Sequence, residues 1–360
     1  MRVKLEDVCV RGSSNLKQSD VIDKTGEYPI YGAAGYIGNV NFYHQDQPYV
    51  AVVKDGAGIG RTSLYPAKSS VIGTMQYLLP KENVLPEYLC YVVKYMHLEK
   101  YFTGATIPHI YFKDYKKEEF NLDTLDKQKE IVNILGRIEC VISSRQQELQ
   151  KLDELIKARF VEFFVGKKYE IVKAGSIIKE MRNGVSPSTR GGHFEKVLTL
   201  SAITQGKFDD KAWKEGFFTD CPSAEKRITE DDFYICRGNG NKSLVGMGVY
   251  ALENRADLVF PDTVIAAHID TERMVLPYLW IMWQQPEVRK QLESGARTTN
   301  GTYKINQKVI SEIKIICPPI NDQEVFADFI NQVNKSKVAV QKALDETKLL
   351  FDSLMQQYFG

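Results

Sequence analysis

One uninterrupted stretch, residues 126–163, constrains the fold of this chain more than any other feature. It contains no proline, and its apolar side chains recur in steps of three or four, at Ile131, Leu135, Ile138, Val141/Ile142, Leu149, Leu152, Ile156, Phe160 and Phe163. This spacing predicts one helix with a single apolar face. At 1.5 Å per residue the helix would be about 55 Å long. Because so narrow an apolar face cannot bury itself, the pattern predicts a second helix packed against it.

The end of the chain, residues 324–359, carries a similar helical pattern and supplies the predicted partner. The segments that precede the two long helices also follow one order: a strand, a glycine loop, another strand, a short aromatic helix and a polar loop. Matching segments are Leu85-Pro86-Glu87-Tyr88-Leu89 with Leu276-Pro277-Tyr278-Leu279, Gly104-Ala105 with Gly295-Ala296, Asp126-Lys127-Gln128 with Asp322-Gln323, and Phe164-Val165-Gly166 with Tyr358-Phe359-Gly360. This order predicts an internal duplication.

The duplication predicts an α+β fold with two similar mixed α/β globular domains and two long antiparallel helices that form a coiled coil, related by an approximate two-fold axis. The predicted boundaries are residues 1–120 for the first globular domain and 121–165 for the central helix. Residues 166–316 form the second globular domain, and residues 317–360 form the C-terminal helix.

Composition favours an ordinary globular protein in a reducing compartment. Hydrophobic residues make up 43% and charged residues 26% of the chain, and the net charge is +1. The six cysteines form no CxxC pair and no metal-ligand spacing, which predicts free thiols and no metal site. The sequence has no apolar run of membrane-spanning length, and its first residues lack the pattern of a signal peptide. We therefore expect a cytoplasmic protein with no membrane contact.

Two similar domains held at a fixed separation suit a ligand with two sites along its length. Duplex DNA is such a ligand, since bipartite readers match the spacing of half-sites to their own geometry. The weak net charge does not itself identify this partner, because proteins that bind DNA by electrostatics alone are usually more basic.

Several segments, taken in order, resemble the specificity subunits of type I restriction–modification systems over essentially the whole chain. In the first half they are residues 28–38 (YPIYGAAGYIG), 54–60 (KDGAGIG) and 125–131 (LDKQKEI). In the second half they are residues 184–188 (GVSPS) and 318–323 (PPINDQ). The first domain is short for the family, which leaves its exact recognition loops open.

The resemblance implies that each globular domain reads one half of a split DNA sequence and that the helices set the spacer between the halves. It also implies that the helices dock two modification subunits, which bring S-adenosylmethionine chemistry. Restriction subunits would add ATP- and Mg-dependent translocation and cleavage. The chain itself would bind no cofactor and would be non-catalytic.

In the first domain, two loops contain residue types suited to DNA contact. Glycines in residues 54–62 would let the backbone approach phosphates, with Lys54 and Arg61 as the cations. Residues 103–113 combine Thr106, His109, Tyr111 and Lys113, which can reach bases and phosphates. A tight hairpin and a surface loop that covers the core are the structural alternatives. Tyr31 and Tyr36 could also reach the groove, although we expect at least one to pack in the core.

In the second domain, the strongest candidate is the polar, basic segment 294–304, with Arg297, Thr298, Asn300 and Lys304. It occupies the position equivalent to residues 103–113, and arginine can pair with guanine and asparagine with adenine. Residues 237–242 (RGNGNK), with Arg237, Asn239 and Lys242, match the first glycine loop. Arg182 and Asn183 in the entry turn are weaker candidates, because turns of this composition are often structural.

Two other functions compete with DNA recognition. The chain could be a methyltransferase or nuclease in its own right, but it has no NPPY-type motif and no glycine-rich Rossmann site, and Gly238–Ser243 lacks the spacing of a phosphate loop. Glu312 and Lys314 resemble a nuclease fragment without an upstream acidic partner. The chain could also be a coiled-coil scaffold with two domains that bind another ligand, which duplication alone does not exclude.

Overall fold

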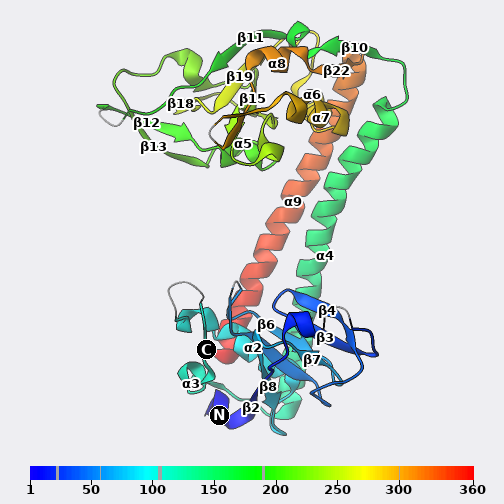
Figure 1. Cartoon of the computed structure of the whole chain (residues 1–360), viewed down its shortest axis with the longest axis vertical. Coiled ribbons are helices and arrows are strands. Elements are labelled where there is room, and N and C mark those ends of the chain that lie inside the picture. Colours follow the sequence, from blue (N-terminus) through cyan, green and yellow to red (C-terminus); the bar gives the residue numbers. More distant parts are fainter. Residues whose placement is uncertain (22–23, 57, 104–107, 189–190, 300) are drawn as a thin grey trace. The chain divides into compact units, whose positions relative to one another are not determined.

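The structure is a computed structural model that describes residues 1–21, 24–56, 58–103, 108–188, 191–299 and 301–360. Its longest elements are two helices. The helices are α4 (Leu125–Phe164) and α9 (Ile320–Phe359), of 40 residues each (Figure 1). The chain divides into a first unit, Met1–Glu148 with Val340–Gly360, and a second unit, Leu149–Ala339. Each long helix therefore contributes one part to each unit. Both predicted helices are confirmed, and α9 begins four residues earlier than the apolar pattern indicated.

The first unit is built on a four-stranded sheet of order β2-β8-β5-β6, beside a three-stranded sheet of order β4-β3-β7 and the pair β1-β9. The strands are β1 (Arg2–Lys4), β2 (Cys9–Ser13), β3 (Tyr28–Gly32), β4 (Gly35–Val40), β5 (Tyr49–Val53), β6 (Thr62–Tyr65), β7 (Ser70–Val71), β8 (Met75–Pro80) and β9 (Glu119–Asn121). The helices are α1 (Leu5–Val8), α2 (Pro86–Tyr95) and α3 (Phe112–Tyr115). Central β5 is buried along its whole length, as its continuous apolar sequence predicts.

The second unit has a four-stranded sheet of order β11-β19-β15-β17, a second sheet of order β13-β12-β18-β14, the pair β10-β22 and the small sheet β16-β21-β20. The strands are β10 (Glu170–Lys173), β11 (Ile178–Asn183), β12 (His193–Leu198), β13 (Trp213–Phe218), β14 (Arg227–Ile228), β15 (Asp232–Cys236), β16 (Gly238–Asn239), β17 (Gly248–Tyr250), β18 (Arg255–Val259), β19 (Val264–Ile269), β20 (Arg297–Thr299), β21 (Thr302–Lys304) and β22 (Lys314–Cys317). The helices are α5 (Ser201–Thr204), α6 (Leu276–Trp283), α7 (Pro286–Gly295) and α8 (Gln307–Glu312).

The two units share one topology, which confirms the predicted duplication. The sheet order β2-β8-β5-β6 of the first unit matches β11-β19-β15-β17 of the second, and in each sheet the central strands pair antiparallel. A second sheet of each unit contains one parallel pair, β3 with β7 and β12 with β18. Strands at equivalent positions of the two sheets thus have the same order and the same antiparallel pairing.

Within the first unit, the start of α4 and the end of α9 close one apolar core. Ile131 and Leu135 of α4 are buried with Met355 and Phe359 of α9, and the ring of Phe359 lies 5.1 Å from that of Tyr88 on α2. Within the second unit, the end of α4 meets the start of α9 instead, so the helices pair antiparallel. Each fully buried side chain of this kind contributes roughly 1.5–3 kcal/mol, which anchors the helices to the globular domains.

The aromatic cluster of the second unit shows how the helix pair is held. The rings of Phe160 and Phe164 on α4, Phe326 on α9 and Tyr278 on α6 stack on or meet edge to face with one another at 4.9–6.4 Å. All four side chains are buried. Lys337 of α9 also pairs with Asp153 of α4 on the outside of the helix pair.

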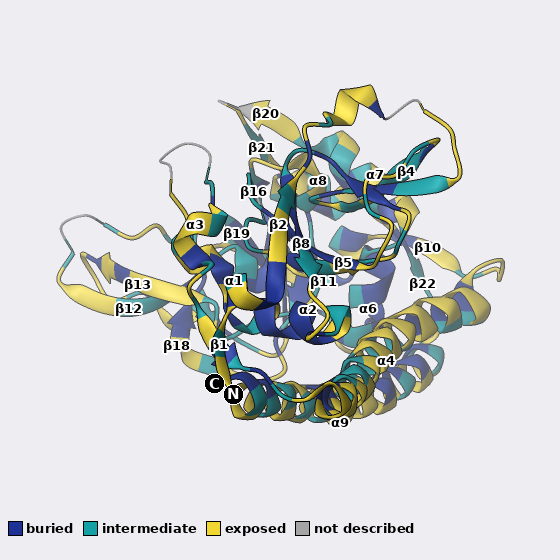
Figure 2. Cartoon of the chain, turned by 90° about the horizontal axis from the view of Figure 1, so that it is seen from below, coloured by how far each residue is buried: buried dark blue, intermediate teal, exposed yellow. Residues whose placement is uncertain are grey.

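Several predicted elements differ in detail. The β-branched and aromatic run at residues 71–79 resembles one strand in sequence but lies in two, β7 and β8, because the chain turns at Gly73, where a Cβ would come within 3.2 Å of the Ser14 carbonyl oxygen. The apolar run 245–252 contributes only the short strand β17, and α6 and α7 are separate helices. The hairpin β12–β13 was not expected, and Figure 2 shows it largely in the colour of exposed residues. No helix in the described part of the chain is long and apolar enough to cross a membrane.

Candidate nucleic-acid interface

The glycine loop of the first unit turns tightly between β5 and β6. Gly56, Gly58 and Gly60 all have positive φ, and a Cβ on Gly60 would come within 2.7 Å of the Glu99 backbone nitrogen. Only glycine combines that conformation with that close approach. The loop is closed by backbone hydrogen bonds from Gly60 to the Val53 carbonyl and from Val53 to the Arg61 carbonyl, both 2.9 Å long. The glycines therefore give the loop its shape. The structural alternative, a tight hairpin without DNA contact, predicts the same role for them.

The described parts of the two loops predicted to contact DNA in this unit lie against each other. The Gly56 N–H donates to the Pro108 carbonyl at 3.0 Å, and the Ile110 N–H donates to the Lys54 carbonyl at 2.9 Å. Asp55 and His109 form an antiparallel bridge, and Asp55 Oδ1 lies 2.7 Å from His109 Nδ1. The segments around Lys54 and His109 thus form one surface.

A third segment, the turn of hairpin β3–β4, joins this surface. Arg61 Nη1 donates to the Ala33 carbonyl in that turn at 3.0 Å. Tyr31 is packed inward, with its ring stacked on Tyr65 at 3.9 Å, whereas Tyr36 is 63% exposed. Tyr36 is therefore the aromatic residue of this hairpin that a ligand can reach.

Tyr111 and Lys113 continue the surface on the other side of His109. The Tyr111 ring stacks beside the His109 ring at 6.4 Å and is 50% exposed. Lys113 Nζ lies 5.3 Å from the centre of the Tyr111 ring, a favourable cation–π geometry. Aromatic faces, a histidine and lysines side by side offer both base and phosphate contacts.

In the second unit the equivalent loops form a small sheet. The glycine loop contributes β16 and the basic segment folds as the hairpin β20–β21, with Gly238 paired to Lys304 and Asn239 paired to Tyr303. Segment 294–304 therefore contains a β-hairpin, where the sequence predicted a polar loop. Because Arg297 is paired with Lys304 across the hairpin, two cations meet on one edge of it.

Most predicted cations of these surfaces have no acidic partner. No described carboxylate forms an ion pair with Arg61, Lys113, Arg237, Lys242, Arg297 or Lys304, and of these Arg61, Lys113, Lys242, Arg297 and Lys304 are exposed. Lys54 differs, since its Nζ lies 3.8 Å from Asp55. Arg237 is half-buried and donates to the Asp262 carbonyl at 3.0 Å. Unpaired exposed cations are the groups that replace counterions on a phosphate backbone.

The structure places Arg182 differently from the expectation of a DNA contact. Its side chain is only 12% exposed and its guanidinium pairs with Asp232, which is completely buried. The guanidinium also donates to the Glu225 carbonyl at 3.1 Å. This buried ion pair links β11 to β15 across β19, which lies between them in the sheet, so the geometry assigns Arg182 a structural role. Asn183 is exposed at the end of β11, and its side-chain oxygen is 3.5 Å from Gln307 Nε2.

Two predicted contacts, Thr106 and Asn300, lie outside the described residues. Thr298 lies on β20 opposite Tyr303 and is exposed, while Asn239 accepts a hydrogen bond from the Asn241 backbone at 2.9 Å. Sequence reasoning missed Asp55 and Tyr303. The only signal for Asp55 was its place beside Lys54, and an acidic residue does not fit the expectation of a basic surface.

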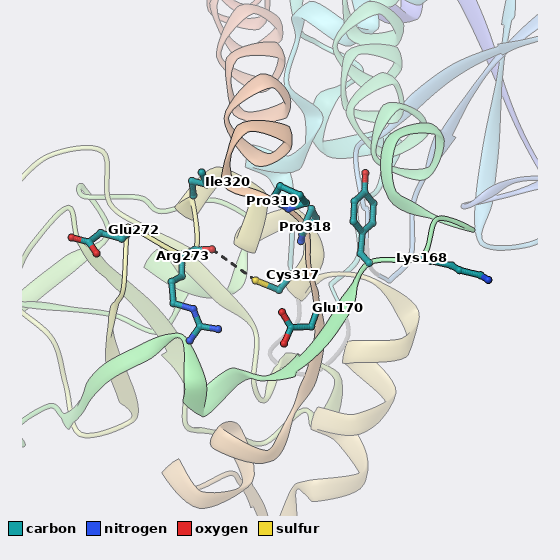
Figure 3. Close-up of a pocket in the computed structure, with 9 residues that line it drawn as sticks. Lys168, Glu170, Glu272, Arg273, Cys317, Pro318, Pro319 and Ile320 are labelled. Carbon is teal, nitrogen blue, oxygen red and sulfur yellow. Dashed lines mark hydrogen bonds between the residues drawn. The ribbon is translucent and has the colours of Figure 1, made fainter.

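A separate hollow of about 480 Å³ lies in the second unit, where β10 and β22 meet the start of α9 (Figure 3). Two cations and two carboxylates line it, so its charges balance: Lys168, Arg273, Glu170 and Glu272. The Cys317 thiol donates to the Arg273 carbonyl at 3.8 Å, and burial raises the pKa of this thiol while Arg273 opposes the rise. No cluster suited to a metal ion occurs there or elsewhere in the described ranges. None of the predicted DNA contacts lines this hollow.

Two solved structures share the fold over almost the whole chain. One is the type I restriction–modification S subunit from M. genitalium, with a TM-score of 0.56, 14% identity, and coverage of 100% of this chain and 96% of that one. The other comes from a study of complex assembly and conformational transition of the type I R-M system, with a TM-score of 0.58, 14% identity, and coverage of 99% and 97%. At such low identity these likenesses show the fold alone.

Sequence comparison adds the family. Residues 1–154 match the model of the type I restriction modification DNA specificity domain. The StySPI specificity subunit of a type I restriction enzyme from Salmonella potsdam is 21% identical over 310 residues. By these matches the chain is similar to the specificity subunits of type I restriction–modification systems. This confirms the family resemblance drawn from the sequence.

The match with the Salmonella protein covers 78% of the present chain but 65% of the relative. A second relative, the MjaIX specificity subunit from Methanocaldococcus jannaschii, is 26% identical over 115 residues, which is 30% of this chain and 27% of the relative. The chain thus spans less than two thirds of the length of the curated relatives that it matches.

Proposed function

We propose that this chain is the DNA-recognition subunit of a type I restriction–modification complex and that each unit reads one half of a bipartite target. One observation carries the proposal: in each unit the glycine loop lies against the polar segment predicted to contact DNA. The two surfaces occupy equivalent places in one topology but differ in their side chains. Equivalent placement with different chemistry is what two different half-sites would require.

The charge of these surfaces supports a nucleic-acid ligand over another kind of partner. Arg61 and Lys113 in the first unit, and Lys242, Arg297 and Lys304 in the second, are exposed and have no ion-pair partner among the described residues. Such cations supply the phosphate contacts that give affinity, and the neighbouring Tyr111, His109 and Asn239 can read base edges.

We further propose that α4 and α9 set the spacer and dock two modification subunits, and that restriction subunits join the full complex. Methyl transfer, with S-adenosylmethionine, and ATP- and Mg-dependent cleavage would then belong to those partners. The chain itself would take no catalytic step. What supports this division of labour is the family resemblance of the chain and the helices that both units share.

The test is to co-express the chain with its methyltransferase partner and to sequence the methylome of the host. We expect one methylated bipartite motif, with two defined half-sites and a fixed spacer, and specific binding of duplexes that contain it. Absence of any such motif, with the complex assembled and S-adenosylmethionine supplied, would contradict the proposal. A chain that transferred methyl groups without its partner would contradict the non-catalytic part alone.

A further inference from the structure

Asp55 and His109 form a side-chain pair in the middle of the first unit's surface. The Asp55 Oδ1 to His109 Nδ1 distance is 2.7 Å, and both side chains are partly exposed, by 31% and 38%. The pair joins two segments that are 54 residues apart in sequence. It stands between Lys54 on one side and Tyr111 on the other.

The chemistry of the pair fixes the protonation pattern of the ring. An ionised carboxylate can only accept hydrogen bonds, so the nitrogen that faces it must carry the proton. Nδ1 of His109 is therefore the N–H donor, and in the neutral ring Nε2 is left as an acceptor. No described residue forms a hydrogen bond with Nε2, so this acceptor is available to a ligand.

The surroundings also fix the orientation of the ring. The His109 backbone exchanges two hydrogen bonds of 2.8 Å with Thr103 and lies in a bridge with Asp55. The Tyr111 ring lies beside the imidazole with an angle of 24° between the planes, and Lys113 lies over Tyr111. A ring held by its backbone, by a stacked neighbour and by a carboxylate presents Nε2 in one direction.

We propose that Asp55 is a positioning residue that makes His109 Nε2 a hydrogen-bond acceptor for an exocyclic amino group of a base. This inference rests on the proposed function, and it names the chemistry that the first unit reads at one position. In the major groove only adenine N6 and cytosine N4 present such an amino group, whereas guanine and thymine present acceptors. His109 would thus favour adenine or cytosine at that position.

Among its described residues the second unit has an aspartate–histidine pair, Asp232 with His268, but it lies on β15 and β19 and not at the matching place. At the matching place Asn239 is paired with Tyr303 and Gly238 with Lys304. The effect of Asp55 should therefore be confined to the half-site that the first unit reads, which makes the other half-site an internal control.

The tautomer is tested first, without DNA, on the full chain labelled with ¹⁵N-histidine. The sequence contains five histidines, so long-range ¹H–¹⁵N spectra are simple, and loss of a signal in His109→Gln assigns the residue. We expect the Nδ1–H form in the wild type and a shift toward Nε2–H in Asp55→Asn, because the amide can donate to Nδ1. Asp114→Asn, which removes the same charge five residues beyond His109, should leave the spectrum unchanged. An Nε2–H form in the wild type would overturn the proposal.

The reading role is tested with the methyltransferase complex and duplexes of the mapped target. Adenines and cytosines of each half-site are replaced one at a time by purine or pyrimidin-2-one analogues that lack the amino group. One replacement in the first unit's half-site should weaken wild-type binding about tenfold and Asp55→Asn binding much less. If the effective replacement is an adenine analogue, His109 reads adenine; if it is a cytosine analogue, His109 reads cytosine.

Equal losses for wild type and Asp55→Asn at every position would overturn the reading role, even if the tautomer behaves as expected. Failure of the complex to bind any bipartite duplex would instead remove the proposed function, and the reading role with it. Because the spectra need no DNA, the two failures are distinguishable.

Discussion

The side-chain carbonyl of Gln323 accepts a hydrogen bond of 3.0 Å from the Val275 N–H at the start of α6. Its amide donates to the carbonyls of Arg273 and Pro318 at 3.1 and 2.8 Å. Gln128 makes the same three hydrogen bonds in the first unit, with Leu85, Asn83 and Asp123. Both glutamines are completely buried. Each glutamine joins a long helix to the short helix of its own unit. Gln128 and Gln323 are also the glutamines of the matching segments Asp126-Lys127-Gln128 and Asp322-Gln323.

Replacement of Gln323 by leucine should destabilise the second unit by roughly 3 kcal/mol, because three buried backbone groups lose their partners. All three tryptophans lie in that unit, so urea unfolding followed by tryptophan fluorescence reports it directly. Gln332→Leu, at an exposed position of α9, is the matched control and should change stability little. Equal stabilities of the two variants would show that the hydrogen bonds of Gln323 do not anchor the helix.

Arg182→Met should also destabilise the second unit, by about 3 kcal/mol, since the buried Asp232 would lose the guanidinium and keep only His268 Nδ1 at 3.2 Å and the Tyr234 hydroxyl at 3.4 Å. The double variant Arg182→Met/Asp232→Leu should recover part of that loss, because no unpaired charge remains. Urea unfolding by tryptophan fluorescence is again the measurement. Normal stability of Arg182→Met together with weakened DNA binding would return Arg182 to the set of DNA contacts.

Arg297→Ala and Lys304→Ala should weaken DNA binding without loss of stability. Each exposed cation that contacts a phosphate accounts for about 0.9 of the slope of log affinity against log salt concentration, so each variant should flatten the slope by roughly that amount. Binding titrations of the complex at salt concentrations from about 50 to about 200 mM measure the slope. Lys290→Ala, an exposed cation on α7 of the same unit, is the control. A slope flattened equally by the control would show that only net charge matters.

The Glu195–Arg227 pair predicts a pH dependence of stability. Two hydrogen bonds of 2.5 and 2.7 Å from the Arg227 guanidinium hold the pKa of the Glu195 carboxyl below its usual value. A depressed pKa stabilises the fold above the unfolded value of about 4.3, and this contribution is lost as the pH falls through the folded pKa. Glu195→Gln should therefore cost about 1 kcal/mol at neutral pH and less below about pH 4.

Urea unfolding at both pH values, followed by fluorescence of Trp213 on the adjacent strand β13, checks this prediction. A cost of Glu195→Gln that stayed constant down to acidic pH would mean that ionisation of Glu195 contributes nothing to stability.

We predict that the lengths of α4 and α9 set the length of the DNA spacer between the two half-sites. Matched insertions of four residues after Glu148 in α4 and after Ala339 in α9 fall at the boundary between the two compact units. Each adds about 6 Å of helix, close to two base pairs of DNA. We expect the methylated motif to gain spacer length while both half-sites stay the same, as read by methylome sequencing. An altered half-site sequence would count against a role of the helices as a spacer.

Local patterns carried much of the fold. The apolar face from Ile131 to Phe163 predicted α4 almost to the residue, because the apolar residues of a long helix recur with its period of 3.6 residues. The hairpin β12–β13 escaped prediction, since its exposed Phe194 and Trp213 break the alternation expected of a half-buried strand. The hairpin β20–β21 was missed because its polar residues resemble a loop.

The sequence by itself determined the duplicated order of elements, the two long helices and the family resemblance, because helical periodicity and ordered motifs are local properties of the chain. Tertiary structure decided which side chains of the candidate surfaces are free. Arg182 and Arg297 look alike in sequence, yet one is buried against Asp232, 50 residues away, and the other is exposed without an acidic partner in the described chain. Likewise, only the fold brings Asp55 to His109. Burial and pairing depend on contacts between distant residues, which no local pattern records.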